Sequence, residues 1–171
     1  SLSFAVIPDG VAFIGEKAFF GCSALQKVML PESVTELHTS TFENCSSLLK
    51  AELRGVKTIG DRAFYNCAAL SEISFSPSLK EIGAFAFSVN TSLEKVTLPP
   101  NTELVSDEAF SRCTSLKTVT VFSEALKMSA TALDGCTSLY AIYGSSAFSS
   151  EAAIGIRNAT VSFDCVSEEK E

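Results

Sequence analysis

The sequence repeats with a period of 23 residues, shortened once to 22. A phenylalanine marks one slot of the repeat and a cysteine marks the slot three residues later. The first slot holds Phe19, Phe42, Phe64, Phe87, Phe110 and then Leu133; the second holds Cys22, Cys45, Cys67, Asn90, Cys113 and Cys136. A period kept through most of a 171-residue chain predicts a solenoid, in which each unit buries its apolar face against its neighbours.

Each repeat also contains a short stretch in which apolar and polar residues alternate. Val28 and Leu30 form one such pair, and Pro31 follows them. Alternation with period two predicts a half-buried strand, and proline suits the end of a strand because it has no N–H to donate. One strand per repeat, always in the same direction, predicts a parallel ladder, and connections between parallel strands are almost always right-handed. The Ala-Phe-x-x-Cys segment is expected to form a helical turn on the opposite side, with its phenylalanine pointing inward as the wedge of each layer.

The expected fold is an α/β repeat, namely a right-handed solenoid with one short parallel strand and a helical or irregular turn in each unit. The array is expected over residues 1–143, as a partial first repeat followed by about six repeats. Residues 144–166 break the period and are expected to form a C-terminal cap, and residues 167–171 a disordered tail. Because the start of the chain aligns with the middle of a repeat, we expect a fragment of a longer protein.

The repeat resembles a known family. The pattern Ile-Gly-x-x-Ala-Phe-x-x-Cys-x-x-Leu-x-x-Val-x-Leu-Pro, matched from Leu2 to about Ile142, is similar to the leucine-rich repeat of the BspA type. That resemblance implies a curved or twisted leucine-rich-repeat solenoid from a bacterial or protist surface or secreted protein. It also implies adhesion or host-protein binding, and no catalytic residues. Three departures are Asn90 in a cysteine slot, Leu133 in a phenylalanine slot, and a turn at 53–56 that is one residue short.

Charge and hydropathy exclude several classes of partner. The formal net charge is −7, and no cluster of lysine and arginine is present. Nucleic acids and anionic membrane surfaces both attract basic patches, so neither is an expected partner. A membrane-spanning helix needs about 18 or more consecutive apolar residues, and no run in the sequence approaches that length. With these classes disfavoured, the resemblance implies a protein ligand, with a host extracellular-matrix or plasma protein as the class to test, and a location at the cell surface or outside the cell.

The cysteines are expected to be structural. Residues stacked in one slot lie roughly 5 Å apart with parallel side chains, whereas a disulfide needs converging Cβ atoms about 3.8 Å apart. Ligands of a metal must likewise converge on a point. The slot is therefore interpreted as a ladder of buried thiols, in which Asn90 fits if its amide bonds free backbone groups of the turns. Cys165 lies outside the ladder and is the thiol expected to be reactive or exposed.

No catalytic, cofactor or metal site is expected. His38 is the single histidine and occupies a slot otherwise held by Gly15, Gly60 and Gly83, so it is interpreted as a surface turn residue. A hydrolase would need converging acid and base groups, and the titratable residues are spread through the repeats. The glycosylation patterns that begin at Asn44, Asn90 and Asn158 are interpreted as chance matches, with Asn90 expected to face inward.

The strand face is the candidate ligand-binding surface, because repeat solenoids present such faces to partners. Its outward side chains are expected to align in two columns from repeat to repeat, with Lys50 and Glu72 as a cross-strand pair. The candidate residues are Lys27, Met29, Lys50, Glu52, Glu72, Ser74, Lys95, Thr97, Thr118, Thr120 and Tyr143. The leading functional hypothesis is a non-enzymatic adhesion or protein-binding module. The alternative is a structural spacer with no ligand of its own, favoured by the absence of a continuous aromatic stripe from this face.

Overall fold

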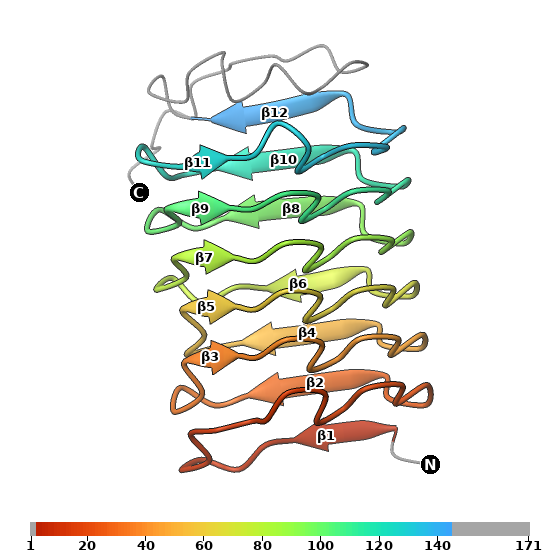
Figure 1. The fold of residues 1–171 in the computed structure, drawn as a ribbon, viewed down its shortest axis with the longest axis vertical. Helices are drawn as coiled ribbons and strands as arrows, with labels where there is room; N and C mark the ends of the chain where they lie inside the picture. The colour runs from red at the N-terminus through yellow and green to blue at the C-terminus, as the bar shows by residue number, and fades with distance from the viewer. Residues whose placement is uncertain (1–2, 145–171) are drawn as a thin grey trace, which may run out of the picture.

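The computed structural model describes residues 3–144, which form a column of stacked layers, one layer for each repeat (Figure 1). Each layer contributes one strand of three or four residues, and neighbouring strands that pair do so in parallel. These strands are β1 (Phe4–Val6), β2 (Lys27–Leu30), β4 (Lys50–Leu53), β6 (Glu72–Ser74), β8 (Lys95–Leu98), β10 (Thr118–Val121) and β12 (Ala141–Gly144). Residues of the same slot are register partners, as in Val28 with Ala51. The predicted parallel ladder is confirmed.

A second parallel sheet lies on the other side of the column, and the prediction of one strand per repeat is wrong in this respect. Its five strands have two residues each: β3 (Glu36–Leu37), β5 (Thr58–Ile59), β7 (Glu81–Ile82), β9 (Leu104–Val105) and β11 (Lys127–Met128). Each strand buries its second residue, completely from Leu37 to Val105 and partly at Met128. A strand of two residues is too short to show the alternation by which strands are recognised in a sequence.

The turn that carries the phenylalanine contains no helix, so the α/β description is corrected to an all-β solenoid for the described residues. In this turn, successive N–H groups alternate between an acceptor in the same turn and an acceptor in the next layer. The N–H of Cys45 closes a local turn on the carbonyl of Phe42 (3.2 Å), whereas the N–H groups of Phe42 and Asn44 donate to the next layer (2.7 and 2.9 Å). Asn44 also has a left-handed backbone conformation (φ 62°). A helix needs every N–H to bond along its own axis, so none can propagate here.

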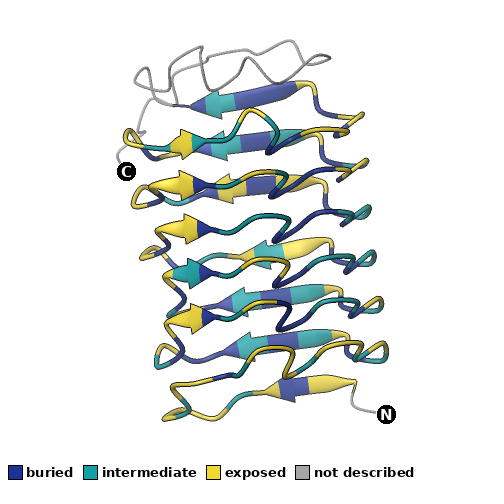
Figure 2. Cartoon of the chain, in the orientation of Figure 1, coloured by how far each residue is buried: buried dark blue, intermediate teal, exposed yellow. Residues whose placement is uncertain are grey.

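Buried residues recur in successive layers along the stack (Figure 2), and their side chains form the core. The phenylalanine rings stack almost parallel, with centroids 5.1 Å apart between Phe42 and Phe64 and 5.2 Å apart between Phe64 and Phe87. These separations match the spacing of hydrogen-bonded strands, about 4.8 Å. From Phe42 to Phe110 each ring is almost fully buried. The inward wedge predicted for the phenylalanine slot is confirmed.

Several predictions fall outside the described residues. These are the C-terminal cap apart from Gly144, the tail, Cys165 and the glycosylation pattern at Asn158. Within residues 3–144, a helix long and apolar enough to cross a membrane is not found.

Candidate protein-binding surface

The strand face carries the predicted columns of outward side chains. Lys27 is the register partner of Phe4 on one side and of Lys50 on the other, and Lys50 is in turn the partner of Glu72. The C-terminal strands continue the pattern, since Thr118 pairs with Lys95. The candidate residues are exposed or half-buried along the whole face. The structure therefore brings them together on one surface, as a period-two strand requires.

Ion pairs occupy the N-terminal half of this face. The Nζ of Lys50 lies 3.1 Å from a carboxylate oxygen of Glu72, which confirms a predicted cross-strand pair. Glu52 is shared by three cations: Lys27 at 3.0 Å, Lys50 at 3.7 Å and Arg54 at 3.7 Å. The hydrogen bond from Lys27 and the charges of these neighbours hold the pKa of the Glu52 carboxyl below its ordinary value. Exposed ion pairs contribute little to stability, but they neutralise the lysines that a ligand would meet.

The C-terminal half of the face is different. Thr97, Thr118 and Thr120 lie beside Lys95, which makes no ion pair within residues 3–144. Phe122 follows β10 with 46% of its surface exposed, and Tyr143 is half-buried on β12. This half therefore offers hydroxyl groups, one unpaired cation and aromatic surface. Tyrosine and phenylalanine are enriched in protein interfaces, whereas lysine and glutamate are depleted.

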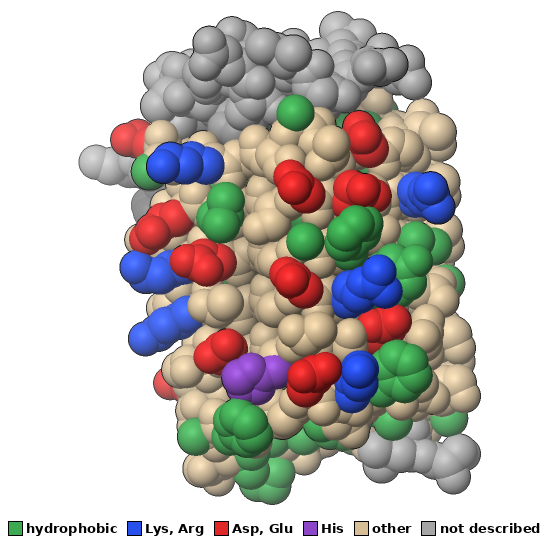
Figure 3. Space-filling view, in the orientation of Figure 1, with side chains coloured by type: hydrophobic (Ala, Val, Ile, Leu, Met, Phe, Trp, Pro, Cys, Tyr) green, Lys and Arg blue, Asp and Glu red, His purple; other side chains and the backbone are tan. Residues whose placement is uncertain are grey.

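The opposite face carries the short strands drawn in Figure 1, and the space-filling view in the same orientation shows charges of both signs on it (Figure 3). His38 lies there half-buried, with its ring centroid 4.9 Å from that of Phe13 and its Nδ1 3.5 Å from a carboxylate oxygen of Glu36. His38 is thus packed more closely than its interpretation as a surface turn residue predicted. Among the described residues, no group of three or more His, Cys, Asp or Glu side chains is placed to hold a metal ion.

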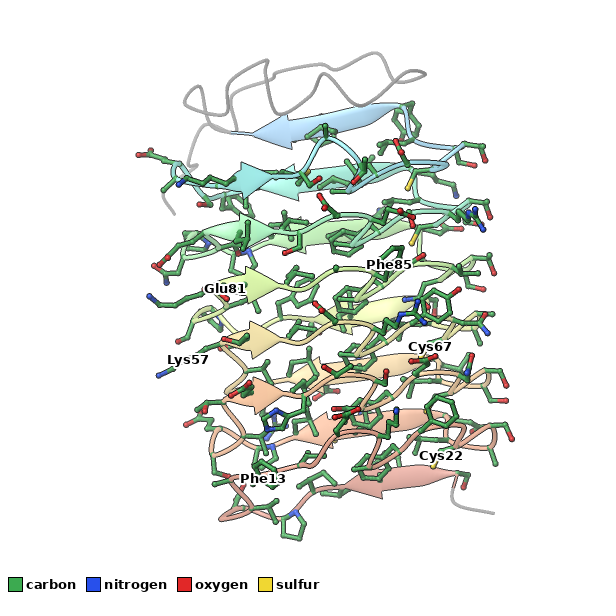
Figure 4. The ribbon with its side chains drawn as sticks, in the orientation of Figure 1. Phe13, Cys22, Lys57, Cys67, Glu81 and Phe85 are labelled. Carbon is green, nitrogen blue, oxygen red and sulfur yellow. The ribbon has the colours of Figure 1, made fainter. Side chains whose placement is uncertain are left out.

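The cysteine ladder is a column of thiols that donate to carbonyls of the neighbouring layer. The Sγ atoms of Cys45, Cys67, Cys113 and Cys136 lie 3.1–3.2 Å from the carbonyls of Phe19, Phe42, Phe87 and Phe110 respectively. These four thiols are buried and unpaired by disulfides. The prediction of burial fails for Cys22, which is half-buried because its layer is the first of the described stack (Figure 4).

Asn90 departs from this arrangement. Its side chain is completely buried, as predicted, which leaves its glycosylation pattern inaccessible in the folded chain. However, neither its Nδ2 nor its Oδ1 has a hydrogen-bond partner. The expectation that the amide would bond free backbone groups is therefore wrong, because a position in the stack does not guarantee that an acceptor lies within reach.

Thiol reactivity provides a test of the ladder. In the native protein we expect Cys45, Cys67 and Cys113 to react with a thiol reagent at least about 100-fold more slowly than in denaturant, because burial excludes the reagent. The neighbouring thiol of Cys45 and burial raise the pKa of the Cys67 thiol, and the neighbouring thiol of Cys136 and burial do the same for Cys113, which disfavours the reactive thiolate at both. Cys22 should react before the others. Mass spectrometry of labelled peptides measures these rates, and rapid native labelling of Cys67 would contradict the buried ladder.

Comparison with known proteins supports the same architecture. The model of the BspA type leucine rich repeat region, in six copies, matches residues 1–89 and 47–152. A leucine-rich repeat protein from Bacteroides ovatus superposes with a TM-score of 0.83 at 27% identity, over 96% of this chain and 42% of that protein. The leucine rich repeat protein of T. pallidum gives 0.78 at 29% identity, over 96% and 87%. A comparison with curated proteins gave no significant match.

A leucine rich cell surface protein from Faecalibacterium prausnitzii gives a TM-score of 0.71 at 26% identity, over 90% of this chain and 50% of that protein. The chain thus spans less than half of the B. ovatus protein and half of the F. prausnitzii protein. The repeat pattern, the stacked layers and the family match agree: the chain belongs to the BspA-type leucine-rich repeat family.

Proposed function

We propose that this chain is a non-enzymatic protein-binding module of a cell-surface or secreted protein, and that its ligand lies on the strand face. The observation that carries the proposal is the two columns of outward side chains, which strand register aligns within each of the two sets of paired strands, β1-β2-β4-β6 and β8-β10-β12. Solenoids use such extended surfaces for partners. The similarity to a protein described as a cell surface protein supports the proposed location.

Within the face, the C-terminal half is the better place for a ligand. On the N-terminal half a partner must displace the contacts of Lys27, Lys50, Glu52 and Glu72, and desolvating paired charges is costly. On the C-terminal half Thr97, Thr120 and Phe122 present hydroxyls and apolar surface without that cost. We therefore place the centre of the ligand on β8 and β10.

The test is a binding screen of the purified chain against extracellular-matrix and plasma proteins, with an unrelated acidic solenoid as the control. For a ligand found in this way, the double variant Thr97→Arg and Thr120→Arg should raise Kd at least about tenfold, equivalent to about 1.4 kcal/mol. Two large cations at the centre of an interface obstruct packing, and central residues dominate binding energy.

A matched control is Thr58→Arg, which places the same side chain at a half-buried outward position of β5 on the opposite sheet. It should leave Kd unchanged. Equal effects of the two changes would place the ligand elsewhere. The absence of saturable binding across the panel would favour the structural spacer, which the neutralised lysines of the N-terminal half also suit.

A further inference from the structure

The sheet of longer strands is divided at one place. Its strands form a set of four, β1-β2-β4-β6, and a separate set of three, β8-β10-β12. In the slot before each strand, the N–H groups of Leu49, Ser71 and Lys117 donate to the preceding layer at 2.8, 3.1 and 2.8 Å. Within the described chain, the equivalent N–H of Glu94 makes no such bond, and the nearest inter-layer backbone bond on this side is made two residues earlier, where the N–H of Ser92 donates to the carbonyl of Ala68 at 3.2 Å. The boundary between β6 and β8 is therefore the one interrupted step of this ladder within residues 3–144.

The unsatisfied Asn90 lies in the turn that leads into β8. In four of the other rungs, those of Cys45, Cys67, Cys113 and Cys136, the thiol donates to a phenylalanine carbonyl 25 or 26 residues earlier. A thiol that loses this bond remains a small apolar group, whereas a buried primary amide without partners is strongly disfavoured relative to an amide in water. Closure of the fourth layer onto the third is thus penalised at Asn90, and the penalty falls as soon as water reaches the amide.

The two layers that meet at this boundary show further irregularities. Val89 adopts a left-handed conformation (φ 64°), in a slot where Asn44, Asn66, Arg112 and two glycines meet the same requirement. Left-handed backbone is unfavourable for a β-branched residue. On the strand side, Ile73 is half-buried although Val28, Ala51 and Val96 in its slot are buried. Backbone conformation is therefore less favourable at this boundary than at its neighbours, and Ile73 is less completely buried, although the Phe75 ring packs edge-on against that of Phe87 at 5.7 Å.

The remaining sides of the column are continuous across the boundary. On the second sheet β7 pairs with both β5 and β9. In the turns, the N–H of Phe64 donates to Ala86 at 2.8 Å, and the N–H of Asn66 donates to Ser88 at 2.9 Å. The rings of Phe64 and Phe87 stack at 5.2 Å. Motion at the boundary must therefore open the strand side while the other two sides hold the layers together.

We propose that the boundary between β6 and β8 is a joint, set by Asn90, at which the strand face opens and closes between two stiffer blocks. Opening admits water to the Asn90 amide and is resisted by no strand-to-strand hydrogen bond on that side. The joint separates the ion-paired half of the strand face from the half that carries Thr97 and Thr120. It does not depend on the proposed ligand.

Two NMR measurements on the unliganded chain test the joint. The Glu94 amide should exchange with solvent at least about tenfold faster than the amides of Leu49 and Lys117, since exchange follows local opening. Relaxation dispersion, which detects motion on the microsecond to millisecond scale, should show exchange at residues of β6 and β8 and not at those of β4 and β10.

The variant Asn90→Cys restores the thiol of the other rungs and should remove both signatures. The matched variant Cys113→Asn places an amide one layer further on and should transfer them to the boundary between β8 and β10, where the Lys117 amide would lose its protection. The proposal would be overturned if the Glu94 amide of the wild-type chain were as well protected from exchange as the Lys117 amide. It would also be overturned if the relaxation dispersion persisted unchanged in Asn90→Cys. Because Asn90→Cys reproduces a native rung, its result can be obtained even if Cys113→Asn does not fold.

Discussion

Replacing Phe64 with alanine is expected to destabilise the folded array by about 3–5 kcal/mol, the usual cost of emptying a phenylalanine site in a core. The Phe64 ring is completely buried and is stacked between those of Phe42 and Phe87, at 5.1 and 5.2 Å. Stacked rings also contribute beyond the area that they bury. Because its backbone is tied to the next layer through its own N–H, the turn cannot readily collapse into the space.

Urea denaturation followed by circular dichroism measures this loss. The control is Phe122→Ala, which removes a ring of the same size from an exposed position and should change stability by no more than about 0.5 kcal/mol. A loss below about 1 kcal/mol for Phe64→Ala would contradict the stacked core, since that value is small for a large-to-small change at a buried site.

Replacing Gly55 with alanine is expected to cost about 3 kcal/mol, at the upper end of the usual range for overpacking. The turn at 53–56 is one residue short, and a Cβ atom at position 55 would lie 2.1 Å from the carbonyl oxygen of Glu32 and 2.6 Å from its Cα. Both atoms belong to the backbone, so no rotation of a side chain can relieve the overlap. The layers must separate at this turn, or the turn must be rebuilt.

Gly15→Ala is the matched control. A Cβ atom there meets only the edge of the Phe13 ring, at 3.7 Å, which is an ordinary contact. It should change the free energy of unfolding by no more than about 0.5 kcal/mol. Equal stabilities of the two variants would show that the short turn has room for a side chain and that glycine is not required there.

Much of the core and of the candidate surface could be predicted from the sequence. A layer in a solenoid contacts only its two neighbours, so the period alone aligns Phe42, Phe64 and Phe87 into a buried column. The period-two alternation within a strand then determines which residues face outward. In this way Lys50 and Glu72 were predicted to be cross-strand neighbours, and their charged groups lie 3.1 Å apart.

Other features could not be predicted in this way. The phenylalanine turn was expected to be helical because its apolar spacing of three residues is also that of a helix. In the structure, alternate N–H groups of the turn bond to the next layer, which a single repeat cannot reveal. The second sheet consists of two-residue strands, and the column that includes Leu37, Ile59 and Ile82 was its only sequence signal.

Asn90 illustrates the difference between what the sequence predicts and what only the tertiary structure shows. The sequence alone identified it as the exception in the cysteine slot and placed it inside, but gave no means of knowing whether its amide finds a partner. By itself the sequence determined the layers, the buried columns and the outward columns, because these depend on spacing along one chain. Only the tertiary structure decided the second sheet, the non-helical turns, the sharing of Glu52 among three cations and the divided strand ladder. Each of these depends on distances between atoms of different layers, which are set by how closely the stacked layers pack.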